Sequence, residues 1–280
     1  MEATSDKPTA KERAGPNTVF SRVLIGVDGS PESSEAARQA ARLLEDEGEL
    51  TLLSAYDIAP ALIGGTGSRV PAYFDEDVQR KAADDALRGV LDEIDGHSSS
   101  RANIVRGNPW QELIREAERG RATLIAVGSH GIGRRRGVAF GSTATEVSHK
   151  APCSVLVARR AGPDFPRRIS VGVDGSPQSR SAYAAARSVA DRFSAELWPV
   201  VAHGGRGIDK RLVAEIVDRR HEDLPDEPVP ALVAAAADGD LLVVGSRGLH
   251  GLRSLGSVSE RVAHQAHSSV LIVRNGGRRS

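Results

Sequence analysis

The sequence predicts an α/β protein made of two tandem doubly wound units, each an open, Rossmann-like parallel sheet of five strands flanked by helices, with the second unit shortened. Three observations lead to this prediction. The chain has 280 residues, enough for about two domains of roughly 150 residues each. Its short apolar runs are continuous and alternate with helical patterns, as in a parallel sheet covered on both faces. Three sequence blocks also occur twice in the same order.

The first unit opens with a strand followed by a capped helix. Val23–Val27 is a short run rich in β-branched residues, and Asp28 begins a turn. Ser30 then stands at the N-cap position of a helix, with Pro31 at its first residue. The helical pattern continues to about Glu45.

The remaining segments continue the alternation of strands and helices. Residues 57–70 are rich in glycine and show no period, so they are predicted to form a loop. In the second unit the third strand is hard to locate, because residues 221–230 contain three prolines and four acidic residues. The expected strands of the first unit are Leu50–Ala55, Ala102–Arg106, Leu124–Val127 and Ser154–Ala158, and the expected helices are Asp75–Ile94, Trp110–Glu118 and Thr143–Lys150.

The repeat sets the expected domain boundaries. The matched blocks begin at Arg22 and Arg168, at Leu124 and Leu241, and at Gly141 and Gly256. We therefore expect a disordered tail over 1–19, a first domain over 20–160, a linker over 161–167, a second domain over 168–275 and a short tail over 276–280. The stretch from Asp174 to Gly245 is shorter than the matching stretch from Asp28 to Gly128, so the second copy has lost residues from its middle.

Composition excludes several classes of protein. Lys+Arg and Asp+Glu number 37 each, which argues against a chain-wide electrostatic footprint for nucleic acid. No apolar run reaches the ~18 residues that a membrane span needs, and the N-terminal segment lacks the apolar region of a secretory signal. Cys153 is the only cysteine, so an internal disulfide is excluded. We expect a cytoplasmic protein that has neither nucleic acid nor a membrane as its partner.

A glycine-rich loop after the fourth strand is the strongest candidate for a binding site. In an open parallel sheet, ligands bind beyond the carboxyl ends of the strands, where the strand order reverses. The glycines between Gly128 and Gly141 allow close approach by an anion, and Ser142 and Thr143 open the next helix. This pattern fits a polyphosphate cradle, and it also fits a plain turn with a serine N-cap. The chain has no GxxxxGK[ST] motif, and the GxGxxxG at Gly131–Gly137 misses the dinucleotide fingerprint.

Three features of the sequence resemble the ATP-binding universal stress proteins. The glycine loop has the family's G-2x-G-9x-G-[S/T] spacing. An opening of the VGVDGS type lies at Ile25–Ser30, and an ending like HKAPCSVLVAR lies at His149–Arg159. The resemblance covers Ser21–Arg274 as two tandem copies, and it implies ATP as the ligand.

The resemblance implies a ligand-binding role for seven residues of the first copy. Asp28 matches the family's acidic residue near the ribose and phosphates, Ala55 the position whose backbone reads the adenine edge, Gly128, Gly131 and Gly141 the glycines around the ribose and phosphates, and Ser142 with the amide of Thr143 the phosphate donors. Asp28 also fits a plain Asx turn between strand and helix. We expect an alanine at Gly128 to bring its Cβ against the bound nucleotide.

The second copy departs from the pattern. Only seven residues, Leu249–Leu255, separate its second and third motif glycines, instead of nine. A shorter loop takes a tighter path over any phosphate. The residues that match the first site are Asp174, Ala202, Gly245, Gly248, Gly256 and Ser257, and we expect them to bind nucleotide more weakly.

Two functions of different classes remain open. The first is a universal stress protein that binds ATP as a regulatory ligand; Mg²⁺ could accompany the ATP, but no general base is evident for more than slow hydrolysis. The second is a nucleotide-free structural or interaction protein that dimerises through its sheet edges. A third interpretation, an enzyme of the related adenine-nucleotide α-hydrolase group, is disfavoured because its SGGxDS-type loop is missing.

Assembly is expected to involve the last strand of each copy. Ser154–Ala158 and Ser269–Val273 are apolar and lie at or near a sheet edge, which is prone to pairing. We expect the two strands to pair about a pseudo-twofold axis within one chain, with a homodimer as a further possibility. His149, His264 and His267 lie near the ends of the last helices, where histidines interact with helix dipoles more readily than with metals.

Overall fold

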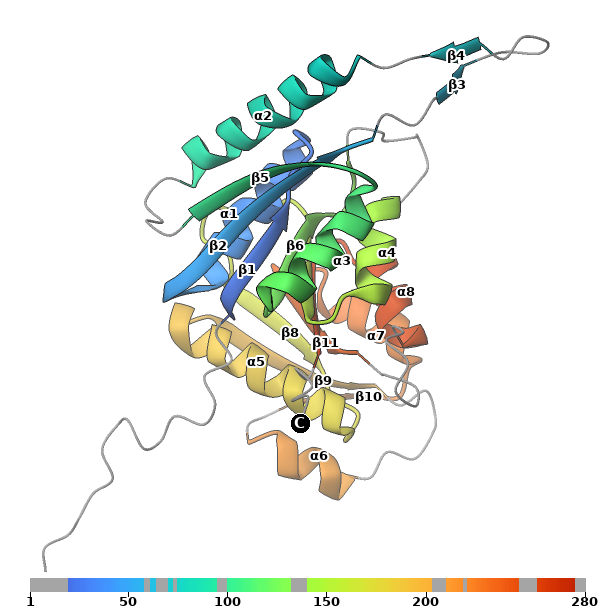
Figure 1. The fold of residues 1–280 in the computed structure, drawn as a ribbon. Coiled ribbons are helices and arrows are strands. Elements are labelled where there is room, and N and C mark those ends of the chain that lie inside the picture. Colours follow the sequence, from blue (N-terminus) through green and yellow to red (C-terminus); the bar gives the residue numbers. More distant parts are fainter. Residues whose placement is uncertain are drawn as a thin grey trace, which may run out of the picture.

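The computed structural model describes residues 20–57, 61–63, 70–72, 75–94, 100–131, 140–202, 210–218, 221–246 and 256–274. The two predicted tails lie outside these residues. Two copies of one α/β unit follow each other along the chain (Figure 1). The first copy contains β1 (Phe20–Gly26), α1 (Pro31–Leu43), β2 (Leu44–Tyr56), β3 (Ala61–Ile63), β4 (Val70–Ala72), α2 (Glu76–Glu93), β5 (Ser100–Arg106), α3 (Pro109–Gly120), β6 (Leu124–Gly128), α4 (Ser142–Lys150) and β7 (Ser154–Ala158). The second contains β8 (Arg168–Gly172), α5 (Pro177–Phe193), β9 (Glu196–Ala202), α6 (Lys210–Ile216), β10 (Glu222–Leu224), α7 (Pro228–Ala235), β11 (Leu241–Gly245), α8 (Ser257–Gln265) and β12 (Ser269–Val273).

The two copies share one ten-stranded sheet, in the order β10-β9-β8-β11-β12-β7-β6-β1-β2-β5. Within each copy the paired strands of this sheet are parallel, and the order reverses beside its first strand, β1 or β8. Helices α1, α2, α5 and α6 pack on one face, and α3, α4, α7 and α8 on the other (Figure 1). The predicted doubly wound fold is therefore confirmed.

The two sheets predicted from the sequence are joined at the last strands. β7 and β12 pair antiparallel, with Leu156 opposite Leu271. This confirms the expected pairing within one chain. The edges that remain at the two ends of the sheet are those of β5 and β10.

Two arginines connect the copies across the seam, which comprises the paired strands β7 and β12 and the helices α4 and α8 beside them. Arg159 follows β7 and donates from Nη2 to the carbonyl oxygen of Ala263 in α8 (2.6 Å). Arg274 follows β12 and donates from Nη2 to the carbonyl oxygen of Ser148 in α4 (2.6 Å). Each cation therefore lies at the carboxyl end of the other copy's last helix, where the helix dipole favours it.

The start of α1 was predicted correctly, but the start of the strand after it was not. Ser30 caps α1 as expected, accepting from the Ser33 amide at its Oγ (3.2 Å). The expected strand beginning at Leu50 begins instead at Leu44, because α1 ends at Leu43, two residues before the expected end near Glu45, and a 13-residue strand follows directly. Pairing with β1, in which Phe20 lies opposite Leu44, overrides the helical pattern there.

The two difficult middle segments also gain strands. The predicted loop over residues 57–70 contains β3, which pairs antiparallel with β4. The missing third strand of the second copy is β10, three residues paired in parallel with the end of β9. Its short length explains the weak sequence signal, since few residues there carry a strand pattern.

Candidate functional site

A pocket of about 490 Å³ opens at the carboxyl ends of β1, β2 and β6, at the switch point of the first copy. Its lining combines three loops with the start of α4, as the sequence suggested. All seven residues predicted for the first site line it: Asp28, Ala55, Gly128, Gly131, Gly141, Ser142 and Thr143. The structure thus brings together groups that are more than a hundred residues apart in the sequence.

Asp28 organises the turn after β1. Its Oδ1 accepts from the Ser30 amide (3.0 Å) and from Ser30 Oγ (2.6 Å), which makes the Asx turn anticipated from the sequence. A Cβ added to Gly131 would overlap Asp28 Oδ2, so the loop after β6 passes directly against this carboxylate. Asp28 therefore holds the turn at the pocket wall while remaining exposed.

Gly128 packs closely against the first turn of α1. A Cβ built on it would lie 2.7 Å from the carbonyl carbon of Glu32, in the first turn of α1. In the second copy, a Cβ on Gly245 would lie 2.6 Å from the carbonyl oxygen of Gln178. The expectation that alanine at Gly128 would press against nucleotide is corrected accordingly, because its Cβ would meet α1 first.

The start of α4 has no side-chain cap. Gly141 is its N-cap, with extended backbone and no side-chain capping bond, and the Gly141 amide donates to the Ser129 carbonyl (2.8 Å). The next amides, of Ser142, Thr143 and Ala144, belong to the first helical turn and to residues that line the pocket. N–H groups in a first turn have no partner within the helix and carry its positive dipole end, so they favour a phosphate or carboxylate.

Part of the pocket lining is apolar. Leu53, Leu113 and Val127 contribute to its wall, and Pro109 opens α3 beside them. Sequence reasoning missed these residues, although Leu53 lies two positions before Ala55 and so shares its face of the strand. A pocket with one apolar side and one end rich in N–H donors suits a ligand with a flat ring and an anionic tail.

The second copy repeats the turn but not the surroundings. Asp174 Oδ1 accepts from the Ser176 amide (3.0 Å), as Asp28 does from Ser30. Ala202 ends β9, Gly245 ends β11, and Gly256 and Ser257 begin α8, whereas Gly248 lies outside the described residues.

Two features of the second copy work against an anionic ligand. A Cβ on Gly175 would lie 3.1 Å from Leu212 Cβ, so α6 packs on the turn beside Asp174. Glu260 stands in the first turn of α8, at the position where α4 carries Thr145. A carboxylate there competes with phosphate for the helix terminus.

Over the described ranges, the chain offers neither a metal cluster nor a membrane-spanning helix. Among those residues, no cluster of three His, Cys, Asp or Glu side chains is placed to hold a metal ion. None of the helices that the structure describes combines the length and apolar character needed to cross a membrane.

The fold and the pocket define a tandem, doubly wound α/β protein with an uncapped helix terminus at the switch point of its first copy. The sequence profile of the universal stress protein family matches residues 20–159 and 205–274, well over half of the chain. The chain belongs to the universal stress protein family.

Named relatives share the tandem organisation over nearly their whole length. A universal stress protein of Mycolicibacterium smegmatis is 29% identical over 290 residues, which cover 90% of this chain and 96% of the relative. One from Mycobacterium tuberculosis is 28% identical over 292 residues with the same coverage. The crystal structure of a universal stress protein from Archaeoglobus fulgidus has the same fold, with a TM-score of 0.69 at 20% identity, covering 91% of this chain and 96% of that one.

Proposed function

We propose that the first copy binds ATP as a regulatory ligand and that this binding serves the stress response. The observation that carries the proposal is the single pocket that gathers all seven predicted residues around one helix terminus. Its volume of about 490 Å³ lies within the roughly 300–1,000 Å³ typical of small-molecule sites.

Each part of ATP has a chemically matched part of the pocket. The uncapped first turn of α4, with Ser142 and Thr143, supplies N–H donors for phosphates. Leu53, Leu113 and Val127 supply an apolar wall for the adenine ring. An Mg²⁺ carried by the nucleotide would find the exposed Asp28 carboxylate in the pocket lining, and carboxylate oxygen is a ligand that Mg²⁺ prefers.

Regulation would follow from linkage. ATP that bridges the loops after β1 and β6 and the end of β2 stabilises the state in which these elements are ordered together. At one hundred times its Kd, a ligand adds about 2.7 kcal/mol to the free energy of unfolding.

The part of the pocket that the structure describes offers few groups that could act in ATP hydrolysis. The titratable side chains among the described lining residues are Asp28 and His130, and His130 Nδ1 lies 3.0 Å from Ser129 Oγ. We therefore propose ATP as a ligand, hydrolysed slowly at most.

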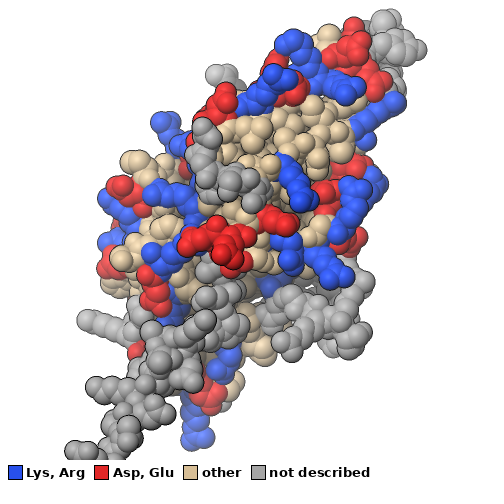
Figure 2. Space-filling view, turned by 60° about the vertical axis from the view of Figure 1, so that its left-hand side comes forward, with Lys and Arg blue, Asp and Glu red and all other residues tan. Residues whose placement is uncertain are grey.

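We further propose that the two copies bind ATP unequally, the first more tightly. Two features of the second copy support this order: Glu260 in the first turn of α8, and Leu212, which packs on the turn beside Asp174. Location in the cytoplasm stays a prediction. On the face drawn in Figure 2, acidic and basic side chains are interspersed. The absence of a nucleic-acid partner also stays a prediction.

The test uses a matched pair of charge substitutions, Ser142→Glu and Ser257→Glu. Both serines are exposed first residues of a last helix, and an acid there favours the helix dipole, so each variant should fold. In calorimetric titration, Ser142→Glu should weaken ATP binding at least about tenfold by repelling phosphate, and Ser257→Glu should leave the tighter site unchanged.

Each other outcome points to a different error. Equal binding by both variants and the parent would mean that the pocket is not the site. If only Ser257→Glu lost ATP binding, the second copy would be the tighter site and the proposed order of affinities would be reversed. Absence of binding by the unaltered protein would favour the nucleotide-free interaction protein, and a homodimer would then have to use the edges of β5 or β10, since β7 and β12 pair with each other.

A further inference from the structure

Phe140, the residue before the α4 cap, packs on a residue of the second copy. Its side chain is buried, with 5% of its surface exposed. Its ring centroid lies 4.3 Å from that of His264 in α8, with the planes tilted by 36°. The guanidinium carbon of Arg159 lies 5.9 Å from the Phe140 ring centroid. The residue that precedes the first turn of α4 is thus held by groups at the seam, where α4 and α8 lie side by side (Figure 1).

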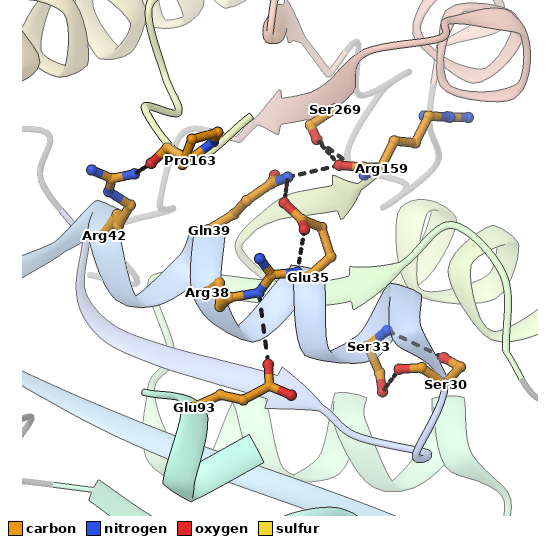
Figure 3. Close-up of polar contacts among 10 residues, drawn as sticks. All are labelled: Ser30, Ser33, Glu35, Arg38, Gln39, Arg42, Glu93, Arg159, Pro163 and Ser269. Atoms are coloured by element: carbon orange, nitrogen blue, oxygen red, sulfur yellow. Dashed lines mark hydrogen bonds and ion pairs between the residues drawn. The ribbon is translucent and has the colours of Figure 1, made fainter. Parts of the chain in front are cut away.

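The groups around Phe140 are themselves held from several elements. Arg159 donates to Ala263, the residue before His264, and its own carbonyl oxygen accepts from Gln39 Nε2 of α1 (2.7 Å) and Ser269 Oγ of β12 (3.1 Å) (Figure 3). Gln39 also donates to the buried Glu35 (2.7 Å) on α1. Helix α1, both seam strands and α8 therefore meet at one residue beside Phe140.

We infer that the second copy braces the ATP site of the first, with His264 as the positioning residue that holds Phe140 and hence the first turn of α4. This inference rests on the proposed ATP site and gives the second copy a part in that site even where it binds little nucleotide itself. Loss of an aromatic contact of this kind is expected to weaken ATP binding severalfold.

The matching contact in the other direction is of a different kind. His149 occupies in α4 the repeat position that His264 occupies in α8. Its Nε2 lies 3.2 Å from Glu260 Oε1, so it makes a polar contact in place of an aromatic stack. Leu255, the counterpart of Phe140 in the repeat, lies outside the described residues. Among the residues that the structure describes, the aromatic contact runs from the second copy to the first, and His149 serves as the control position.

Charge around His264 gives the brace a pH dependence. Burial is the main cause that lowers the pKa of His264; Arg159 and His149 lower it further, while Glu260 opposes them. The neutral ring is thus the form that the packing favours. The stabilisation that the neutral His264 ring gives to this contact is present above the ordinary histidine pKa of about 6.5. It is lost as the pH falls through the lowered pKa of His264.

The experiment compares four full-length proteins: the parent, His264→Ala, His264→Phe and His149→Ala. In calorimetric titration, His264→Ala should raise the ATP Kd about three- to tenfold, His264→Phe should restore it, and His149→Ala should leave it within about twofold. Between pH 7.5 and 5.5 the parent should lose more ATP affinity than His264→Phe, because only the parent carries a histidine that is protonated at this position. The protonation of ATP itself affects both proteins equally and so does not account for the difference.

A second measurement needs no nucleotide. Hydrogen exchange should be faster in His264→Ala than in His149→Ala at the two bonded amides of this terminus, those of Gly141, which donates to the Ser129 carbonyl (2.8 Å), and Thr145, which donates to the Gly141 carbonyl (2.9 Å). Unchanged exchange and unchanged Kd in His264→Ala would overturn the bracing. Equal effects of both alanine variants would overturn it too, since they would indicate general loosening of the seam. A parent that binds no ATP would refute the proposed function, and the exchange rates would still decide the brace.

Discussion

Alanine in place of Gly128 should destabilise the protein even without nucleotide. The new Cβ would lie 2.7 Å from the carbonyl carbon of Glu32, 2.8 Å from its oxygen and 2.9 Å from its Cβ, closer than the 3.0 Å that real Cβ atoms respect. Two of these atoms are backbone in the first turn of α1, which the Ser30 cap holds in place, so no side chain can simply swing away. Overpacking of this kind costs about 1–3 kcal/mol.

Matched substitutions separate crowding from the general effect of alanine. Gly245→Ala should destabilise for the same reason, through the backbone of Gln178 at 2.6 Å. Gly89→Ala should instead stabilise by about 0.5–1 kcal/mol, because Gly89 lies within α2, is exposed, and has nothing within 4 Å of its added Cβ.

The assay is urea unfolding of the nucleotide-free protein, followed by circular dichroism. Midpoints below the parent for Gly128→Ala and Gly245→Ala, and above it for Gly89→Ala, would support the packing argument. A Gly128→Ala protein as stable as the parent would refute it. If that protein also failed to bind ATP, the glycine would serve the ligand directly.

Two further predictions concern groups outside the pocket. Burial raises the pKa of Cys153 to about 12, so a thiol reagent at pH 8 should label the protein only on unfolding; labelling of the folded protein at the rate of a free thiol would contradict the buried position. The Tyr183 hydroxyl, which donates to Asp218 (2.6 Å), is the main cause that lowers the pKa of Asp218, with Arg187 adding to it. The stability that this interaction confers is present above a pH of about 3.8 and is lost as the pH falls through the lowered pKa of Asp218. In Asp218→Asn the free energy of unfolding should therefore fall less steeply at acid pH than in the parent. The same acid dependence in both proteins would exclude the effect.

The sequence by itself determined the features that depend on short stretches of chain. The continuous apolar runs fixed the parallel strands, and Ser30 with Pro31 fixed the start of α1. The glycine spacing and the two serines at the starts of the last helices located the candidate site, because a turn and a helix terminus are built from neighbouring residues. The repeat then carried the same prediction to the second copy.

Tertiary structure alone decided what depends on residues far apart in the chain. Leu44 belongs to a strand because β1 pairs with it, against the local helical pattern. Gly128 must be glycine because the first turn of α1 lies against it, a contact that no spacing rule contains. The contact between Phe140 and His264 arises only once β7 and β12 pair and bring the two copies together. Periodicity reports which face of an element is buried, but the partner on that face is chosen by packing across the whole fold.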